Sequence, residues 1–214
     1  YMKYKSQEEI AIMREGGRRH AEILRALAEM VKPGVSTLIL EEEALRLIRE
    51  GGDKPAFLGY KPQGARRAFP AALCLSINEE IVHGIPNEKE RIIKEGDIVS
   101  IDLGLIHKGL ITDSAITVGA GAITDEDSKL LKYTKLALEK GIEAAKPGNT
   151  IGDIGYAINL VARETPFSLA EDLVGHGVGY KVHEEPLVPN TGEKGKGIKL
   201  VPGMVLAIEP MLNV

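Results

Sequence analysis

The stretch GDIVSIDLGLIHKGLITDS, residues 96–114, is a predicted β-hairpin with one acidic side chain on each strand. Apolar residues alternate with small or polar ones up to a turn near His107, and a period of two is typical of a strand. If His107 and Lys108 form a two-residue loop, Asp102 lies opposite Asp113 and both carboxylates share one face. A one-residue shift of register would instead send the two acids to opposite faces, where each would be solvated.

Two carboxylates on one face of a hairpin repel each other. Cross-strand Cβ atoms lie roughly 4.5–5.5 Å apart, and like charges at that distance destabilise the pair unless something neutralises them. The hairpin therefore indicates either a shared proton or a divalent cation between Asp102 and Asp113.

The composition predicts a soluble globular chain of one large or two small domains. It has 214 residues, 43% of them hydrophobic, and a net charge of −4 with both signs mixed along the sequence, so no basic footprint indicates nucleic acid. No apolar run reaches about 18 residues and the first segment is charged, which favours the cytoplasm over a membrane or a secretory route. The single cysteine, Cys74, excludes an internal disulfide, and its simplest role is that of a small buried hydrophobe.

Four helices and a β-rich segment accompany the hairpin. Ser6 and Glu9 form a capping-box start for a helix that ends at a Lys-Pro-Gly sequence, residues 32–34. A second helix is expected from about Thr37 to Arg49, and strands from Ala72 to Val82. Two further helices are expected at 124–145 and 151–163.

The order of these segments occurs twice, which predicts a duplicated half-domain with pseudo-twofold symmetry. VKPGVST from Val31 matches AKPGNTI from Ala145, and GDIVSID from Gly96 matches GMVLAIE from Gly203. Glu209 then takes in one half the place that Asp102 has in the other. Chance similarity of two helix exits is the alternative explanation.

Five histidines divide into two groups by their neighbours. His20 lies among charged residues of the first helix and is expected on the solvated surface, and His107 is expected in the hairpin turn. His83, His176 and His183 lie beside or near glycine or proline in VHGIP, GHGVG and VHEEP, and flanking glycines allow close approach of a ligand. Taken singly, each of these three is most simply a hydrogen-bonding loop residue.

Together with the three acids, the loop histidines indicate a metal site. Oxygen ligands with one or two imidazoles suit Mn, Fe, Co or Zn, and bridging carboxylates suit two ions about 3.5–4 Å apart. Such a pair activates water for amide hydrolysis. GHGVG is neither a dinucleotide fingerprint nor a Walker sequence, and the chain has no CxxC pair and no HExxH helix.

The sequence resembles the type I methionine aminopeptidases, members of the pita-bread metallopeptidase family. The matching segments are SINEEIVHGIP, GDIVSIDLG, ITDSA, GHGVG, VHEEP and PGMVLAIEP, and they span essentially the whole chain. The resemblance implies an α+β pita-bread fold, a curved antiparallel sheet covered by helices, with residues 1–214 as a single catalytic domain.

The resemblance also implies a role for each site residue. Four side chains would bind two divalent ions, with Asp113 bridging both and Asp102 bound mainly to one: Asp102, Asp113, His176 and Glu209. Glu209 would also take a proton from the attacking water. His83 would lie near the scissile nitrogen or the substrate amine, and His183 near the carbonyl oxygen. Cys74 and Tyr60 would line the methionine pocket.

Two departures from the family stand out. The family has a further bridging glutamate on a C-terminal strand, and this sequence stops at Val214. The chain is therefore expected to be C-terminally incomplete relative to the family, with a weakened second metal site and uncertain activity. The segment between Tyr60 and Cys74, which contains Arg66 and Arg67, is longer than usual.

The expected function is removal of the initiator methionine from nascent proteins and peptides by a dinuclear metal-activated water, with a preference for small second residues. The partner would be a peptide or nascent chain that begins with Met, and the resemblance allows association with the ribosome. A proline-directed aminopeptidase of the same fold and a non-catalytic peptide-binding relative are the alternatives. A serine hydrolase is disfavoured because no GxSxG sequence surrounds Ser76, Ser100 or Ser114.

Overall fold

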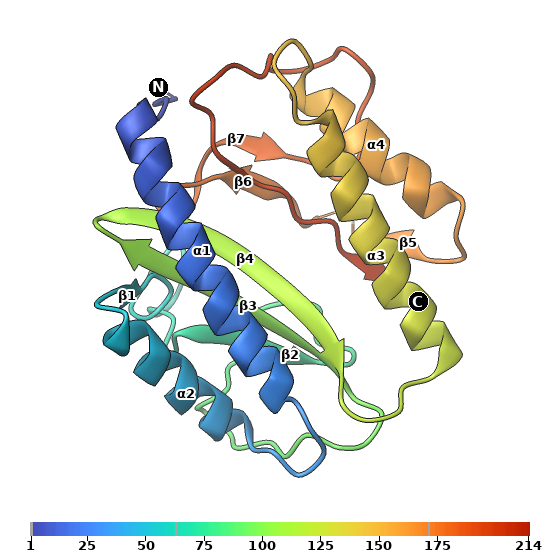
Figure 1. Ribbon diagram of the computed structural model, residues 1–214. Coiled ribbons are helices and arrows are strands. Elements are labelled where there is room, and N and C mark those ends of the chain that lie inside the picture. The colour runs from blue at the N-terminus through green and yellow to red at the C-terminus, as the bar shows by residue number, and fades with distance from the viewer. Residues whose placement is uncertain (1, 63, 171) are drawn as a thin grey trace. The chain divides into compact units, whose positions relative to one another are not determined.

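The computed structural model describes residues 2–62, 64–170 and 172–214 (Figure 1). The chain forms two compact units. Unit 1 comprises residues 1–10, 125–178 and 183–214, and unit 2 comprises residues 11–124 and 179–182. Whether the chain acts as a single catalytic domain stays a prediction.

Unit 2 contains an antiparallel sheet built around β3 (Ile98–His107). One edge of β3 pairs with β4 (Leu110–Gly119), and the other pairs with β2 (Leu73–Ile77) and with the short β1 (Lys54–Pro55). This is the hairpin and the β-rich segment that the sequence predicts.

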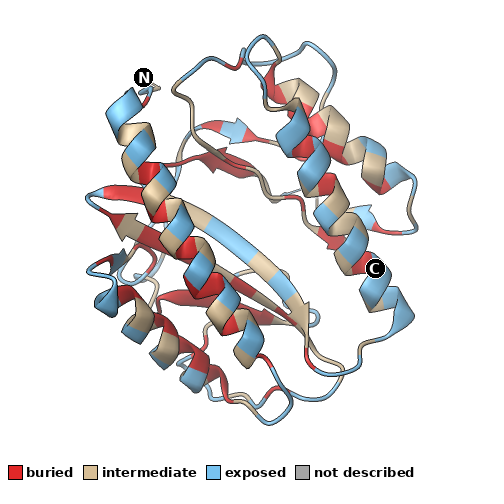
Figure 2. Ribbon diagram, viewed as in Figure 1, coloured by how far each residue is buried: buried red, intermediate tan, exposed pale blue. Residues whose placement is uncertain are grey.

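The hydrophobic core of unit 2 lies between this sheet and two helices, α1 (Gln7–Met30) and α2 (Thr37–Glu50). Alternate residues of β3 are completely buried, and Figure 2 shows buried residues concentrated along β2 and β3. The core cluster joins four residues of β3, three of α1 and three of α2: Val99, Ile101, Leu103, Leu105, Ile23, Leu24, Leu27, Leu40, Ala44 and Ile48. Asp102 therefore lies on the opposite face of β3, which does not pack against the core formed with α1 and α2.

Unit 1 pairs two helices with short strands. The helices are α3 (Asp125–Ala144) and α4 (Ile151–Arg163). One sheet has the order β7-β6-β8, formed by β7 (Glu184–Val188), β6 (Gly175–Gly177) and β8 (Leu206–Ala207). A second pair joins β5 (Ser168–Leu169) to β9 (Leu212–Asn213).

The predicted helix boundaries are confirmed. At the start of α1, the Ser6 N–H donates to Glu9 Oε2 at 2.8 Å and the Glu9 N–H donates to Ser6 Oγ at 3.2 Å, which completes the capping box. Ser36 caps α2, and Thr150 forms a second capping box with Asp153 at the start of α4.

The backbone confirms the duplication. Gly34 and Gly148, the glycines of the two Lys-Pro-Gly turns, have φ angles of +92° and +94°, which favour glycine in both copies. The Gly34 N–H donates to the Ile93 carbonyl and the Gly148 N–H to the Leu200 carbonyl. Each unit thus folds its own helix, turn and helix in the same way and anchors the turn to a matching later segment.

The predicted register of the hairpin is wrong by two residues. Asp102 pairs with Ala115 and Asp113 pairs with Gly104, so the two acids are not directly opposite. The loop is Lys108–Gly109, with φ angles of +48° and +84°, because a two-residue turn that matches the strand twist needs positive φ at both positions and glycine adopts it readily. A shift of two keeps the side chains on their face, so Asp102 and Asp113 do share one face as predicted.

Candidate active site

The face of the unit 2 sheet that carries the two acids also carries the cysteine. Cys74 on β2 pairs with Asp102 on β3, and cross-strand partners share a face. Cys74 is 6% exposed. Asp113 lies diagonally across from Asp102, a relation that places Cβ atoms roughly 7–8 Å apart or less. Two carboxylates and a thiol thus lie together on three adjacent strands.

A buried acid on α2 holds the start of β2 in place. Glu41 is 4% exposed and accepts hydrogen bonds from the Ala72 and Leu73 N–H groups at 2.7 and 3.0 Å. Burial raises the pKa of its carboxyl group, while the two N–H groups oppose that rise. Sequence reasoning missed this residue, although its helical spacing with the core positions Ala44 and Ile48 was a signal.

His83 lies in a loop that folds back onto β2. Its φ is +61°, an uncommon value for a residue with a side chain. The next residue, Gly84, donates from its N–H to Ser76 Oγ at 3.1 Å, and its carbonyl accepts from the Leu75 N–H at 2.8 Å. A Cβ on Gly84 would lie 2.1 Å from the Leu75 oxygen, so only glycine fits. This close packing fixes the backbone that presents His83.

The other predicted substrate residue of unit 2, Tyr60, lies in the loop between β1 and β2. The Tyr60 carbonyl accepts from the Phe69 N–H, and the Gly59 N–H donates to the Phe69 carbonyl, both at 2.8 Å. These two bonds close the loop that contains Arg66 and Arg67, and Arg67 forms an exposed ion pair with Glu88. Residue 63 of this loop lies outside the described residues.

In unit 1 the structure brings three of the predicted residues together. His176 is the middle residue of β6 and is 6% exposed. Its ring lies edge-on to that of His183, with centroids 4.4 Å apart at 70°. His176 Nε2 lies 3.0 Å from Glu209 Oε1, two residues past the end of β8.

The contact between His176 and Glu209 fits two metal ligands. His176 Nδ1 lies 2.8 Å from the Gly177 carbonyl oxygen, which can only accept, so Nδ1 carries a proton, and when the ring is neutral its lone pair is on Nε2. That lone pair faces Glu209 Oε1, a buried oxygen that accepts no hydrogen bond from any described residue. Two acceptors this close need a positive charge beside them, and an imidazole with a carboxylate is a common donor set for divalent transition metals.

The remaining two histidines do not lie where the sequence predicts. His20 was expected on the surface but is 1% exposed, with Nδ1 2.9 Å from Thr112 Oγ1. Burial lowers its pKa from 6.5 to about 4. The charged neighbours of His20 were misleading because only the face of α1 that includes Gly16 and His20 packs inward.

His107 was expected in the turn but ends β3 and is 5% exposed. Its Nδ1 lies 2.7 Å from Asp53 Oδ1, and Arg19 lies 3.6 Å from the other oxygen of Asp53. Both buried histidines are on the helix-covered side of the sheet. Thr112, the partner of His20, pairs with the core residue Leu105, and His107 lies two residues after Leu105 on the same strand. They therefore belong to the support of the hairpin, on the opposite side from Asp113.

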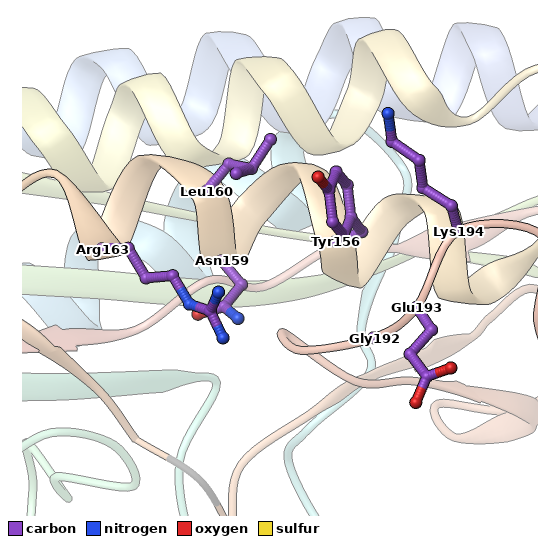
Figure 3. Close-up of a pocket in the computed structure, with 7 residues that line it drawn as sticks. All are labelled: Tyr156, Asn159, Leu160, Arg163, Gly192, Glu193 and Lys194. Carbon is purple, nitrogen blue, oxygen red and sulfur yellow. The ribbon is translucent and has the colours of Figure 1, made fainter.

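A cavity of about 330 Å³ in unit 1 contains none of the predicted site residues. Four side chains from one face of α4 line it together with the loop 192–194 (Figure 3): Tyr156, Asn159, Leu160 and Arg163. The Lys194 ammonium lies 4.8 Å from the centre of the Tyr156 ring. This surface hollow is not the predicted active site.

Residues 11–214 match the model of metallopeptidase family M24. The chain belongs to the M24 metallopeptidases. Membership of this metallopeptidase family implies a divalent metal ion, which agrees with the His176–Glu209 geometry.

Within the M24 family the chain is similar to methionine aminopeptidases. It is 52% identical to the "Methionine aminopeptidase" of Aquifex aeolicus over 98% of this chain and 81% of that protein. The crystal structure of a methionine aminopeptidase from Thermotoga maritima has a TM-score of 0.92 and 38% identity, covering 99% of this chain and 82% of that chain. A prolidase from Pyrococcus horikoshii has a TM-score of 0.78 and 25% identity over 97% of this chain and 55% of its own length. These similarities confirm the predicted pita-bread fold.

No helix in the described part of this M24 chain is both long and apolar enough to cross a membrane.

Proposed function

We propose that this chain is a methionyl aminopeptidase, which hydrolyses the peptide bond after an N-terminal methionine. The observation that carries the proposal is the acceptor pair His176 Nε2 and Glu209 Oε1, 3.0 Å apart, in a chain 52% identical to a methionine aminopeptidase. The substrates are nascent proteins and peptides whose second residue is small.

Two divalent ions, Mn, Fe, Co or Zn, serve as cofactors of this reaction. Four ligands are proposed: Asp102, Asp113, His176 and Glu209. When bound, such ions lower the pKa of water and polarise the carbonyl of the substrate. In support of this set, Asp102 and Asp113 share a face of their sheet, and His176 has the tautomer that a ligand needs.

The chain's own side chains carry the proton transfers. The Glu209 carboxylate takes a proton from the attacking water. His183 donates a hydrogen bond to the carbonyl oxygen as negative charge develops there, and His83 donates to the leaving nitrogen as the C–N bond breaks. The fixed backbone around Gly84 supports this role for His83, since a proton donor acts only from a defined position.

Cys74 and Tyr60 line the pocket for the methionine side chain. Cys74 is buried beside Asp102, which agrees with a small apolar wall close to the metal ligands. Burial raises the pKa of the Tyr60 phenol above its ordinary value. The neutral aromatic ring can pack against an apolar thioether.

Nascent chains are made in the cytoplasm, and we place the enzyme there. Transient contact with the ribosome would bring it to its substrates. Co-sedimentation of the chain with ribosomes, compared with free chain, tests that contact.

The substrate test compares two peptides on metal-depleted protein to which Mn or Co is returned. Met-Ala-Ser should be cleaved after Met, with kcat/KM at least roughly tenfold above that for Ala-Pro-Ser, because the pocket stabilises only the longer apolar side chain. Cleavage of the proline peptide alone would overturn the proposal in favour of a proline-directed enzyme. Tight binding of Met-Ala-Ser without turnover under every metal would favour a non-catalytic binding protein.

The ligand assignment has its own test. Asp113→Asn and His176→Gln should each reduce the number of ions bound per chain, measured by equilibrium dialysis and elemental analysis. Glu43→Gln, which changes a partly exposed acid paired with Arg46, serves as the matched control and should bind as much metal as the unmodified chain. Unchanged stoichiometry in both ligand variants would overturn the assignment.

A further inference from the structure

Lys5 lies in the extended segment before α1 and makes two bonds within unit 1. Its N–H donates to the Gly203 carbonyl at 2.8 Å, and its ammonium donates to Glu184 Oε2 at 2.7 Å. The side chains of Lys5 and Glu184 are only 2% and 13% exposed. An ion pair this deeply buried differs from the exposed pairs on the helices, which contribute little.

One bond reaches the outer strand β7 of the sheet β7-β6-β8, and the other reaches the turn that leads into the outer strand β8. Glu184 opens β7, and Gly203 lies three residues before β8. The middle strand, β6, carries His176. Lys5 therefore joins the first residue of β7 to the turn before β8, and these two strands flank the proposed histidine ligand.

These strands also lead directly to the other two proposed active-site residues of unit 1. Glu184 is bonded in sequence to His183 and pairs across the sheet with Gly177, the neighbour of His176. Glu209 follows β8 by two residues. The positions of His183 and Glu209 relative to His176 thus depend on the places of Glu184 and Gly203.

The backbone around Gly203 is shaped to receive Lys5. Its φ is +91°, and a Cβ there would lie 2.9 Å from the Lys5 carbonyl oxygen and 3.0 Å from Tyr4 Cβ. Only a glycine permits this approach, which is a physical reason for Gly203 besides its place in the repeat.

We propose that Lys5 is a positioning residue for the active site, fixing His183 and Glu209 about His176 through Glu184 and Gly203. The proposal rests on the proposed function for the identity of those three residues. A buried carboxylate held by an ammonium has a favoured position, and removing the ammonium removes the ion pair that holds Glu184 there.

The test compares Lys5→Met, Glu184→Gln and the double variant with the unmodified chain. Residues that orient metal ligands cost roughly 10–100-fold in metal affinity when they are changed, so Lys5→Met should weaken Co binding by such a factor in a calorimetric titration. The double variant removes both charges of the pair and should fold, yet it should still bind Co at least roughly tenfold more weakly. Lys140→Met, which breaks an exposed 2.8 Å pair with Glu143 on α3, is the control and should leave Co affinity unchanged.

A purely structural role gives a different pattern. Lys5→Met would then lower the unfolding temperature of the metal-free protein while the double variant bound Co like the unmodified chain, and that result overturns the proposal. Because the measurement is Co affinity, it is independent of peptide cleavage. If the unmodified chain binds Co and cleaves no methionyl peptide, the proposed function fails while the role of Lys5 at the metal ligands is still decided.

Discussion

His20 and His107 are buried imidazoles that hold the helix-covered face of the hairpin. Each has a partner at Nδ1, Thr112 for His20 and Asp53 for His107. The Nε2 atom of each is buried and has no hydrogen-bond partner among the described residues. Burial makes the charged form of His20 costly, so we expect His20 to limit stability in acid.

The pH dependence of unfolding tests this for His20. The unfolded chain takes up a proton near pH 6.5, whereas the folded protein keeps His20 neutral down to a pKa of about 4. Because the unfolded state binds more protons between these values, His20 should remove roughly 3 kcal/mol of stability as the pH falls from 6.5 to 4.

Urea unfolding at several pH values measures that loss, with His20→Gln as the comparison. Glutamine keeps a polar partner for Thr112 but does not titrate, so the variant should lose less stability over this range. Equal losses in the two proteins would show that His20 is not the group responsible.

At the scale of single residues, the sequence located motif-bearing side chains better than supporting ones. The loop histidines were singled out as candidate site residues because glycine or proline lies near them in the sequence, and their roles stay predictions. Glu41 and Lys5 were missed because an acid on a helix and a lysine before a cap are most often solvated. Only the tertiary contacts reveal that these two charges are buried.

The elements follow the sequence closely, except where the turn could be formed in two ways. Alternation predicts β3 and β4 but does not fix which two residues turn, and the structure uses Lys108–Gly109 where His107–Lys108 was expected. Glycine at the second loop position was the overlooked signal. The prediction that the two acids share one face was still correct, because the predicted register was wrong by an even number of residues.

Glu41 supplies a prediction for the junction of α2 and β2. Glu41→Ala leaves two buried N–H groups without their acceptor, at about 1–3 kcal/mol each, so the free energy of unfolding should fall by several kcal/mol. Glu43→Ala on the same helix breaks only a surface pair with Arg46 and should cost less than about 1 kcal/mol. Similar losses in a denaturant titration would mean that Glu41 does not support β2.

The adjacent glycines of α1 supply a second element-scale prediction. A Cβ at Gly17 meets no atom within 4 Å, so Gly17→Ala should raise the free energy of unfolding by about 0.5–1 kcal/mol. A Cβ at Gly16 lies 3.0 Å from His107 Cβ, and Gly16→Ala should show no such gain. Equal stabilisation by both changes would contradict the close packing of α1 on His107.

At the scale of the whole molecule, the two units share the same order of elements but differ in the size of their hydrophobic core and in the length of their strands. The hydrophobic cluster of α1, α2 and the β3 sheet lies entirely in unit 2. In unit 1, β6 and β8 have only three and two residues. The duplication was visible in the sequence because both Lys-Pro-Gly turns need glycine. The larger hydrophobic core of unit 2 was not visible, because it depends on how many side chains each sheet buries.

Metal binding should slow local opening most in unit 1, because the short strands β6 and β8 open more readily than the core strands of unit 2 that carry Asp102 and Asp113. A cation that binds only the folded protein adds about 2.7 kcal/mol at a concentration 100 times its Kd. Hydrogen exchange with and without Mn should show slower exchange at His176 and Gly177 when Mn is present, and little change at Ile101 and Leu103. Uniform slowing in both units would contradict this prediction.

The short strands that hold His176 have a consequence for the lifetime of the protein in a cell. Chains made during a shortage of the cation would open first around β6 and β8, and intracellular proteases cleave open segments. A shortage of the cation would then lower the amount of the protein in the cell, because the metal-free chains would be degraded and would not accumulate.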